Sequence, residues 1–165
     1  AYVEVLREEI HGPGFQVLPG VSALLEALTA GGAVVGLCTG NVPQGARIKL
    51  SRAGLDRHFE WGPDAIGGFA DDGEDREAVV RAALERAARR LARPLRPADA
   101  LVIGDTPRDV AAACAHGVPV LAVATGRFGV EELRAAGADE ALPTLEGAAE
   151  ALLAWARGGA LPRRP

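Results

Sequence analysis

Two carboxylates flank a proline in the stretch VIGDTPRDV, residues 102–110. Asp105 follows an apolar run and a glycine, and Asp109 lies four residues further on. If a helix follows the run, both carboxylates can point into one crevice, because side chains one helical turn apart share a face. Two carboxylates repel each other unless a cation lies beside them, and Mg²⁺ favours such oxygen ligands. The alternative is structural: Asp109 could favour the positive helix N-terminus, and Asp105 could cap the helix.

The triplet Thr39-Gly40-Asn41 follows a second apolar run. A hydroxyl group and successive backbone N–H groups at a helix N-terminus bind phosphate oxygens well, which makes the triplet a candidate phosphate site. Thr39 could instead only cap the helix that follows, as threonine commonly does after a strand. The residue types are consistent with both interpretations.

Arg76 follows the acidic segment DDGED and opens a strongly amphipathic stretch. The helix macrodipole disfavours a cation at a helix N-terminus, so this position suggests a role in neutralising a phosphate group and nearby carboxylates. The alternative is a surface ion pair with Asp75 or Glu77. Lys49 is predicted to lie on a solvated helix face, and the acidic segment itself is predicted to be a solvated turn.

The elements that would position these residues alternate along the chain. Apolar runs of strand length cover 33–39, 65–69, 100–104, 118–126 and 139–143, and helical patterns cover 1–11, 21–32, 41–54, 76–91, 106–117, 130–138 and 145–157. Strands without polar alternation are buried on both faces, which predicts an α/β fold with a parallel sheet. Ligands of such folds bind beyond the carboxyl ends of the strands. Thr39, Asp105 and Arg76 are therefore expected to meet at one edge.

Composition narrows the classes of partner. The chain has 165 residues and a net charge of -4, which argues against a nucleic-acid partner. It has no apolar run long enough to span a membrane, and no membrane partner is expected. A small phosphorylated substrate remains compatible, because a local site can be positive on an acidic protein. Cys38 and Cys114 are predicted to be buried free thiols in a reducing cytoplasm, and the isolated histidines are predicted to be structural: His11, His58 and His116.

The ordered set of Thr39 in LCTGN, Arg76 before a helix and GDTPRD resembles the haloacid-dehalogenase-like phosphatases, most closely their phosphoglycolate-phosphatase-like branch. Thr39 matches the second motif of that superfamily and Arg76 the third. Asp105 and Asp109 match the acidic fourth motif, GDxxxD. The stretch FQVLPGVSALLEALTAGG is similar to the family segment that joins a cap to the core.

The resemblance implies a three-layer Rossmann-like core with a parallel sheet. It divides the chain into a remnant of a helical cap with its linker (1–16) and the core (17–157). The remaining stretch, 158–165, is predicted from the sequence to be a flexible tail. The resemblance also implies Mg²⁺-dependent hydrolysis of a small phosphomonoester through an aspartyl-phosphate. Thr39, Gly40, Asn41 and Arg76 would then bind the phosphoryl group, while Asp105 would carry Mg²⁺ and Asp109 would support the ion or Arg76.

The chain departs from the family in one respect. The first motif, DxDxT/V after an apolar strand, is not in the sequence, and the acids upstream of Thr39 fall in helical patterns: Glu4, Glu8, Glu9 and Glu26. The expectation is an N-terminally incomplete phosphatase that lacks its nucleophile, is inactive alone and has no direct pairing between the strands before Thr39 and Asp105. The alternative is a non-catalytic phosphate- or nucleotide-binding module. The sequence does not indicate an oligomeric state.

Overall fold

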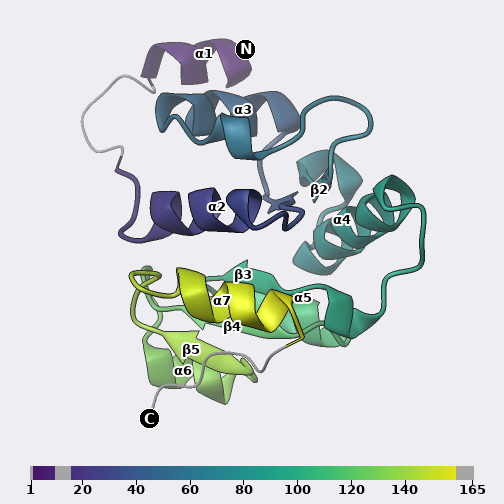
Figure 1. Cartoon of the computed structure of the whole chain (residues 1–165). Coiled ribbons are helices and arrows are strands. Elements are labelled where there is room, and N and C mark those ends of the chain that lie inside the picture. Colours follow the sequence, from purple (N-terminus) through teal and green to yellow (C-terminus); the bar gives the residue numbers. More distant parts are fainter. Residues whose placement is uncertain (1, 10–15, 159–165) are drawn as a thin grey trace.

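The computed structural model describes residues 2–9 and 16–158, in which helices and strands alternate (Figure 1). The helices are α1 (Tyr2–Glu9), α2 (Val21–Ala30), α3 (Pro43–Arg52), α4 (Arg76–Arg90), α5 (Pro107–Ala115), α6 (Val130–Ala135) and α7 (Ala149–Ala156). The strands are β1 (Leu37–Cys38), β2 (Gly67–Gly68), β3 (Val102–Gly104), β4 (Val120–Val123) and β5 (Glu140–Leu142). Short 3-10 turns lie at η1 (Asp56–His58), η2 (Ala70–Asp72) and η3 (Pro97–Asp99).

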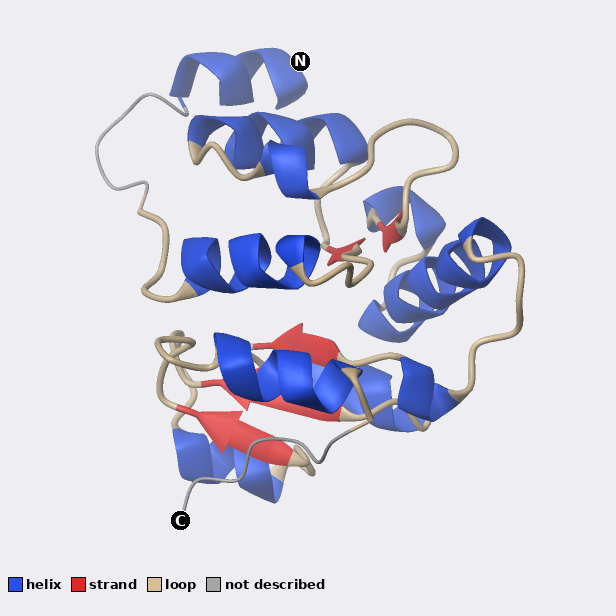
Figure 2. Cartoon of the chain, viewed as in Figure 1, coloured by secondary structure: helices blue, strands red, loops and turns tan. Residues whose placement is uncertain are grey.

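The strands form two separate parallel groups. β1 pairs with β2, with Leu37 opposite Gly67, and the other sheet has the order β3-β4-β5. Figure 2 shows the two groups of strands on either side of a break. Within the described residues β1 does not pair with β3. The prediction of a parallel α/β fold is confirmed, and so is the expected lack of direct pairing between these two strands.

Helices cover both faces of the three-stranded sheet. Successive residues of β4 point to opposite faces: Val120 and Ala122 pack with Leu133 of α6 and with α5, whereas Leu121 packs with α7 and α2. This alternation is the period of two that a strand imposes on its side chains. The result is the three-layer core that the resemblance implied.

Helix contacts connect the two groups of strands. α4 packs against α5, and α2 lies beside α7 (Figure 1). α1 lies against α3. The assignment of residues 1–16 to a cap remnant stays a prediction, and residues 10–15 lie outside the described part of the chain.

The strands are shorter than their apolar runs. The run at 33–39 forms ladder bonds only near its end, where the N–H of Leu37 donates to Ile66 O (3.3 Å) and that of Thr39 donates to Gly68 O (3.0 Å). With a neighbour on one side only, β1 stays two residues long, and Val34 is exposed. Within the described ranges no helix is long and apolar enough to cross a bilayer.

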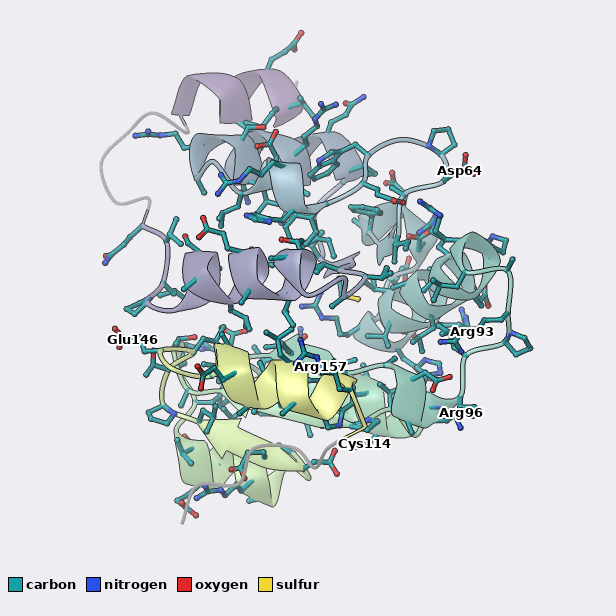
Figure 3. The ribbon with its side chains drawn as sticks, viewed as in Figure 1. Asp64, Arg93, Arg96, Cys114, Glu146 and Arg157 are labelled. Carbon is teal, nitrogen blue, oxygen red and sulfur yellow. The ribbon has the colours of Figure 1, made fainter. Side chains whose placement is uncertain are left out.

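One expectation about the cysteines is wrong. Both are free thiols, as predicted, but only Cys38 is partly covered and Cys114 is exposed. The side chains of Val110 and Ala113 on α5 point into the core, whereas Cys114 lies on the solvent side of the helix (Figure 3). Small apolar helical segments do not distinguish a core position from its neighbour one residue away.

Candidate functional site

The start of α4 and the start of α5 meet at one ion pair. The Nε of Arg76 lies 2.5 Å from Oδ1 of Asp109, and the side chain of Asp109 is only 4% exposed. The contact between Arg76 and an acid of the GDTPRD segment is confirmed, and no ion pair with Asp75 or Glu77 forms in the described part of the chain. Arg76 uses only its Nε for this contact, and its two Nη groups have no acceptor among the described residues.

The second oxygen of Asp109 is also fully used. Its Oδ2 accepts hydrogen bonds from the Thr106 hydroxyl (2.7 Å), the Thr106 N–H (3.1 Å) and the Asp105 N–H (3.3 Å). The Asp109 N–H in turn lies 3.3 Å from the Thr106 hydroxyl oxygen, which completes a capping box at the start of α5. Thr106, and not Asp105, therefore caps this helix. With four donors on its two oxygens, Asp109 is placed to anchor its neighbours.

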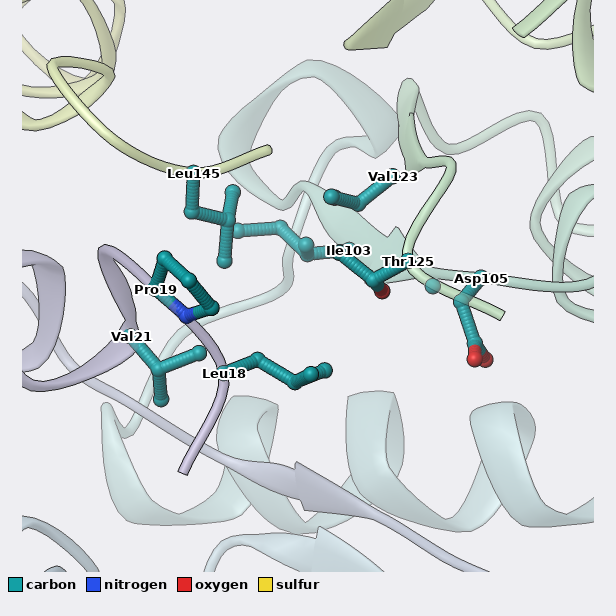
Figure 4. Close-up of a pocket in the computed structure, with 9 residues that line it drawn as sticks. Leu18, Pro19, Val21, Ile103, Asp105, Val123, Thr125 and Leu145 are labelled. Atoms are coloured by element: carbon teal, nitrogen blue, oxygen red, sulfur yellow. The ribbon is translucent and has the colours of Figure 1, made fainter. Parts of the chain in front are cut away.

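Asp105 has the opposite environment. It is exposed at the end of β3, and its carboxylate accepts no hydrogen bond within the described ranges. A side chain at Gly126 would lie 2.9 Å from Asp105 Oδ2, so the glycine leaves room for the carboxylate. Asp105 lies at the rim of a cavity of about 310 Å³, away from the apolar group of Leu18, Val21 and Leu145 (Figure 4).

The Thr39 group lies at the end of β1. The Thr39 hydroxyl oxygen accepts from the Asn41 backbone N–H (3.1 Å) and from Asn41 Nδ2 (2.9 Å). Lys49 Nζ donates to Asn41 Oδ1 (3.0 Å). A methyl group at Gly40 would meet nothing within 4 Å, so this backbone is accessible. The prediction that Lys49 lies on a solvated helix face is wrong, since the lysine is half-buried and turns back to the end of β1.

The charges of the ion pair act on the thiol of Cys38. Burial raises the pKa of the Cys38 thiol, the charge of Arg76 opposes this rise, and the charge of Asp109 adds to it. Both charges therefore act at the end of β1, one residue before Thr39. The predicted residues come together in two groups, one at β1 and one joining α4 with β3 and α5, and no hydrogen bond between described residues joins Thr39 to Arg76 or Asp105.

The acidic segment before α4 is only in part the solvated turn that was expected: Asp71, Glu74 and Asp75 are exposed, whereas Asp72 is half-buried. Asp72 accepts two hydrogen bonds from Arg86, at 2.6 and 2.7 Å, and its Oδ2 also accepts from the Phe69 N–H (2.8 Å). Arg86 also donates to Gly67 O (2.6 Å), which ties α4 to β2. Asp75 caps α4 by accepting from the Ala78 N–H (2.7 Å). Asp72 and Asp75 hold α4 in position, and they thereby fix the position of Arg76, its first residue.

Asp105 is the group in this site that suits a metal ion. Mg²⁺ is commonly bound through one or two carboxylates, with waters and phosphate oxygens completing its shell. The unpartnered Asp105 carboxylate meets that need, whereas Asp109 would have to give up its donors. Among the described residues no group of three or more acidic, cysteine or histidine side chains surrounds a common point. The chain's own residues thus fit an ion bound mainly through Asp105.

Two of these contacts were not predicted from the sequence, although both are central to the geometry. Lys49 contacts Asn41 across 8 residues, and Arg86 contacts Asp72 across 14. Neither spacing belongs to a local helical or capping pattern. Lys49 being the chain's only lysine was a weak signal.

Known proteins share parts of this sequence. A family model described as HAD-hydrolase-like matches residues 78–148, which include β3, the GDTPRD segment and all of α4 except its first two residues, Arg76 and Glu77. Phosphoglycolate phosphatase from Rhodospirillum rubrum is 40% identical over 116 residues, which are 68% of this chain and 44% of that protein. The chain therefore spans less than half the length of this curated relative.

Solved structures share the fold. A predicted phosphatase from Clostridium acetobutylicum superposes with a TM-score of 0.68 and 26% identity, over 89% of this chain and 66% of that chain. A HAD family hydrolase from Deinococcus radiodurans R1, solved with bound phosphate and sodium, has a TM-score of 0.61 and 21% identity, over 84% of this chain and 60% of that chain. Both cover most of this chain and extend well beyond it.

Proposed function

The chain belongs to the haloacid-dehalogenase-like hydrolases, and from that premise we propose that it is the phosphate- and metal-binding part of a phosphatase that hydrolyses a small phosphomonoester with Mg²⁺. The observation that carries the proposal is that Asp109 holds Arg76 with one oxygen and the Asp105 N–H with the other, while the Asp105 carboxylate accepts no hydrogen bond from the described residues. Phosphoryl transfer depends mostly on positioning and charge neutralisation, which this arrangement can supply.

Each residue has one task in this proposal. Asp109 holds Arg76 through Nε, which leaves the two Nη groups to donate to phosphoryl oxygens. At the end of β1 the Thr39 hydroxyl and the Gly40 N–H donate to the same group. The Asn41 N–H already donates to Thr39, so Asn41 positions the hydroxyl and does not bind phosphate through its backbone. Asp105 would hold Mg²⁺, which when bound neutralises charge on the phosphoryl group.

The nucleophile is proposed to lie on a strand that enters the space between β1 and β3. These strands do not pair with each other, and Asp105 and Thr39 lie at their ends. A strand there would bring its carboxyl end to the same edge, as parallel strands do. We propose that the first-motif segment, DxDxT/V, supplies this strand, and that residues 1–165 alone do not turn over substrate. The free thiols Cys38 and Cys114 favour a cytoplasmic location.

Hydrolysis of p-nitrophenyl phosphate tests the proposal. A protein that carries the first-motif segment ahead of this chain should show Mg²⁺-dependent turnover, and the 165-residue chain should show none. Thr39→Val and Arg76→Met should each lower kcat/KM at least a hundredfold, since a donor to developing charge contributes on that order. Turnover by a protein shown by mass to contain only these residues would contradict the proposal.

A further inference from the structure

Lys49 lies at the end of a hydrogen-bond chain whose direction follows from its chemistry. An ammonium group has three donors and no acceptor, so Lys49 Nζ can only donate, and the atom 3.0 Å away must be the amide oxygen of Asn41. This fixes the orientation of the amide. Asn41 Nδ2 then faces Thr39 and can only donate to the Thr39 hydroxyl oxygen, at 2.9 Å.

The Thr39 hydroxyl receives a second donor from the Asn41 backbone. That N–H lies 3.1 Å from the same oxygen, so both of its lone pairs are used. Its own proton must point elsewhere, and within the described residues it meets no acceptor. The hydroxyl is therefore held as a donor with its proton directed away from Asn41.

From these contacts we propose that Lys49 is a positioning residue of the phosphate site, which acts through Asn41 to hold the Thr39 hydroxyl as a hydrogen-bond donor to phosphate. The inference rests on the proposed phosphate-binding function. The charge of Lys49 also strengthens the chain, because hydrogen bonds from an ionised donor are stronger and polarise the bonds that follow. Lys49 does not itself touch the phosphate group.

A neutral residue at position 49 removes this constraint. Without the ammonium group the Asn41 amide loses the donor that selects this orientation, and an amide turned by half a turn would present its oxygen to the Thr39 hydroxyl. The hydroxyl proton would be spent on Asn41 and lost to the ligand.

A double-mutant cycle with inorganic phosphate as ligand tests the proposal on the 165-residue chain. Lys49→Met should weaken phosphate binding about tenfold, in line with one lost hydrogen bond to a charged group. Lys49→Arg keeps a donor-only cation and should bind within about twofold of the unsubstituted chain. Arg52→Met removes a charge from the exposed end of the same helix and should also bind within about twofold.

The cycle separates positioning from direct attraction. In an Asn41→Ala background, Lys49→Met should have no further effect, because the route to Thr39 is already broken. If Lys49→Met weakens binding equally in both backgrounds, Lys49 acts by its charge alone and the proposal is wrong. Unchanged urea-unfolding midpoints in the single variants would show that binding, and not folding, is affected.

The side-chain amide signal of Asn41 in ¹H–¹⁵N NMR spectra gives a readout without phosphate. It should shift in Lys49→Met and stay in place in Lys49→Arg and Arg52→Met. If the chain binds no phosphate but the signal behaves in this way, the hydrogen-bond chain stands and the proposed function fails. An Asn41 signal unaffected by Lys49→Met would overturn the inference whatever the phosphate result.

Discussion

Asp105 and Asp109 share a motif but differ in their partners, and substitutions should separate them. Asp105→Asn removes a charge with no hydrogen bond in the described chain, so the free energy of unfolding should change by less than about 0.5 kcal/mol. Asp109→Asn breaks the ion pair and leaves the partly buried Arg76 without its anion, which should cost about 2–3 kcal/mol. Urea denaturation measures both.

Enzymatic activity should be sensitive to Asp105 even though stability is not. In a protein that carries the first-motif segment, Asp105→Asn should abolish Mg²⁺-dependent hydrolysis while the fold stays intact. Retained activity within a few-fold would sink the assignment of Asp105 as metal ligand. Equal losses of stability in the two variants would contradict the distinct roles given to the two carboxylates.

Asp72 should make stability depend on pH. The hydrogen bonds from Arg86 hold the pKa of the Asp72 carboxyl below its usual range. A carboxyl whose pKa is lower in the folded than in the unfolded state stabilises the fold above its unfolded pKa, about 3.9, and loses this contribution as pH falls towards the folded pKa. The excess stability over Asp72→Asn, about 1 kcal/mol, should persist from pH 7 to about 5 and shrink below about pH 4.

Denaturation at a series of pH values checks this. Asp71→Asn is the matched control, because the Asp71 side chain has no hydrogen-bond partner in the described chain and its variant should track the unsubstituted protein. A difference between the Asp72 variant and the unsubstituted chain that grows towards acid would reverse the sign and refute the argument.

At this scale the sequence predicts contacts that follow from local spacing. The Thr106–Asp109 capping box and Pro107 at the first helical position are short-range patterns of this kind. The Arg76–Asp109 pair followed from placing both residues at one edge of a parallel sheet. The Lys49–Asn41 and Arg86–Asp72 pairs were missed, because they depend on how long side chains bend back across a helix.

Among the elements, β2 and α4 approach so closely that only glycine fits between them. A methyl group at Gly68 would overlap the carbonyl oxygen of Val79. Gly68→Ala should therefore push α4 from β2 and lower the free energy of unfolding by about 1–3 kcal/mol, the range found for overpacked cores. Gly40→Ala is the control for stability, because a methyl group there meets nothing, and it should change the free energy by less than about 0.5 kcal/mol. Thermal or urea unfolding of the two variants decides the point.

Helices and strands differ in how well the sequence predicts them. α2, α4 and α5 begin and end within one or two residues of their expected bounds, since a glycine, a capping residue or a proline marks their ends. β1 and β2 are only two residues long, although their apolar runs cover seven and five. An apolar run shows which residues are buried. The length of a strand depends on a neighbouring strand that offers hydrogen bonds, and the run does not encode that neighbour.

For the whole molecule, the break between β1 and β3 should be visible in amide hydrogen exchange. The Val102 N–H donates to Pro119 O at 2.9 Å, so the N–H of the next residue, Ile103, points to the other edge of β3, where the described chain has no strand. Ile103 should exchange at least tenfold faster than Val102 in NMR experiments. An Ile103 amide as protected as that of Val102 would mean that some other part of the molecule covers this edge.

The parallel fold and the split sheet were both expected, for different reasons. The alternation of apolar runs and amphipathic stretches predicts the layers directly. The split was predicted only through the resemblance, because no property of the 165 residues by themselves indicates a missing neighbour. Ile103 is consistent with this: it is an apolar strand residue that is 39% exposed.

The open edge of β3 bears on the solubility of the chain. Unpaired strand edges act as templates for aggregation, and natural proteins limit this by keeping edge strands short or charged. β1, at two residues, is a poor template, but β3 offers three residues and the exposed Ile103. Edge-to-edge association at high concentration should therefore run through β3, and the charge of Asp105 at its end should oppose it. The position that receives a strand in the proposed enzyme is thus the position from which the isolated chain would precipitate.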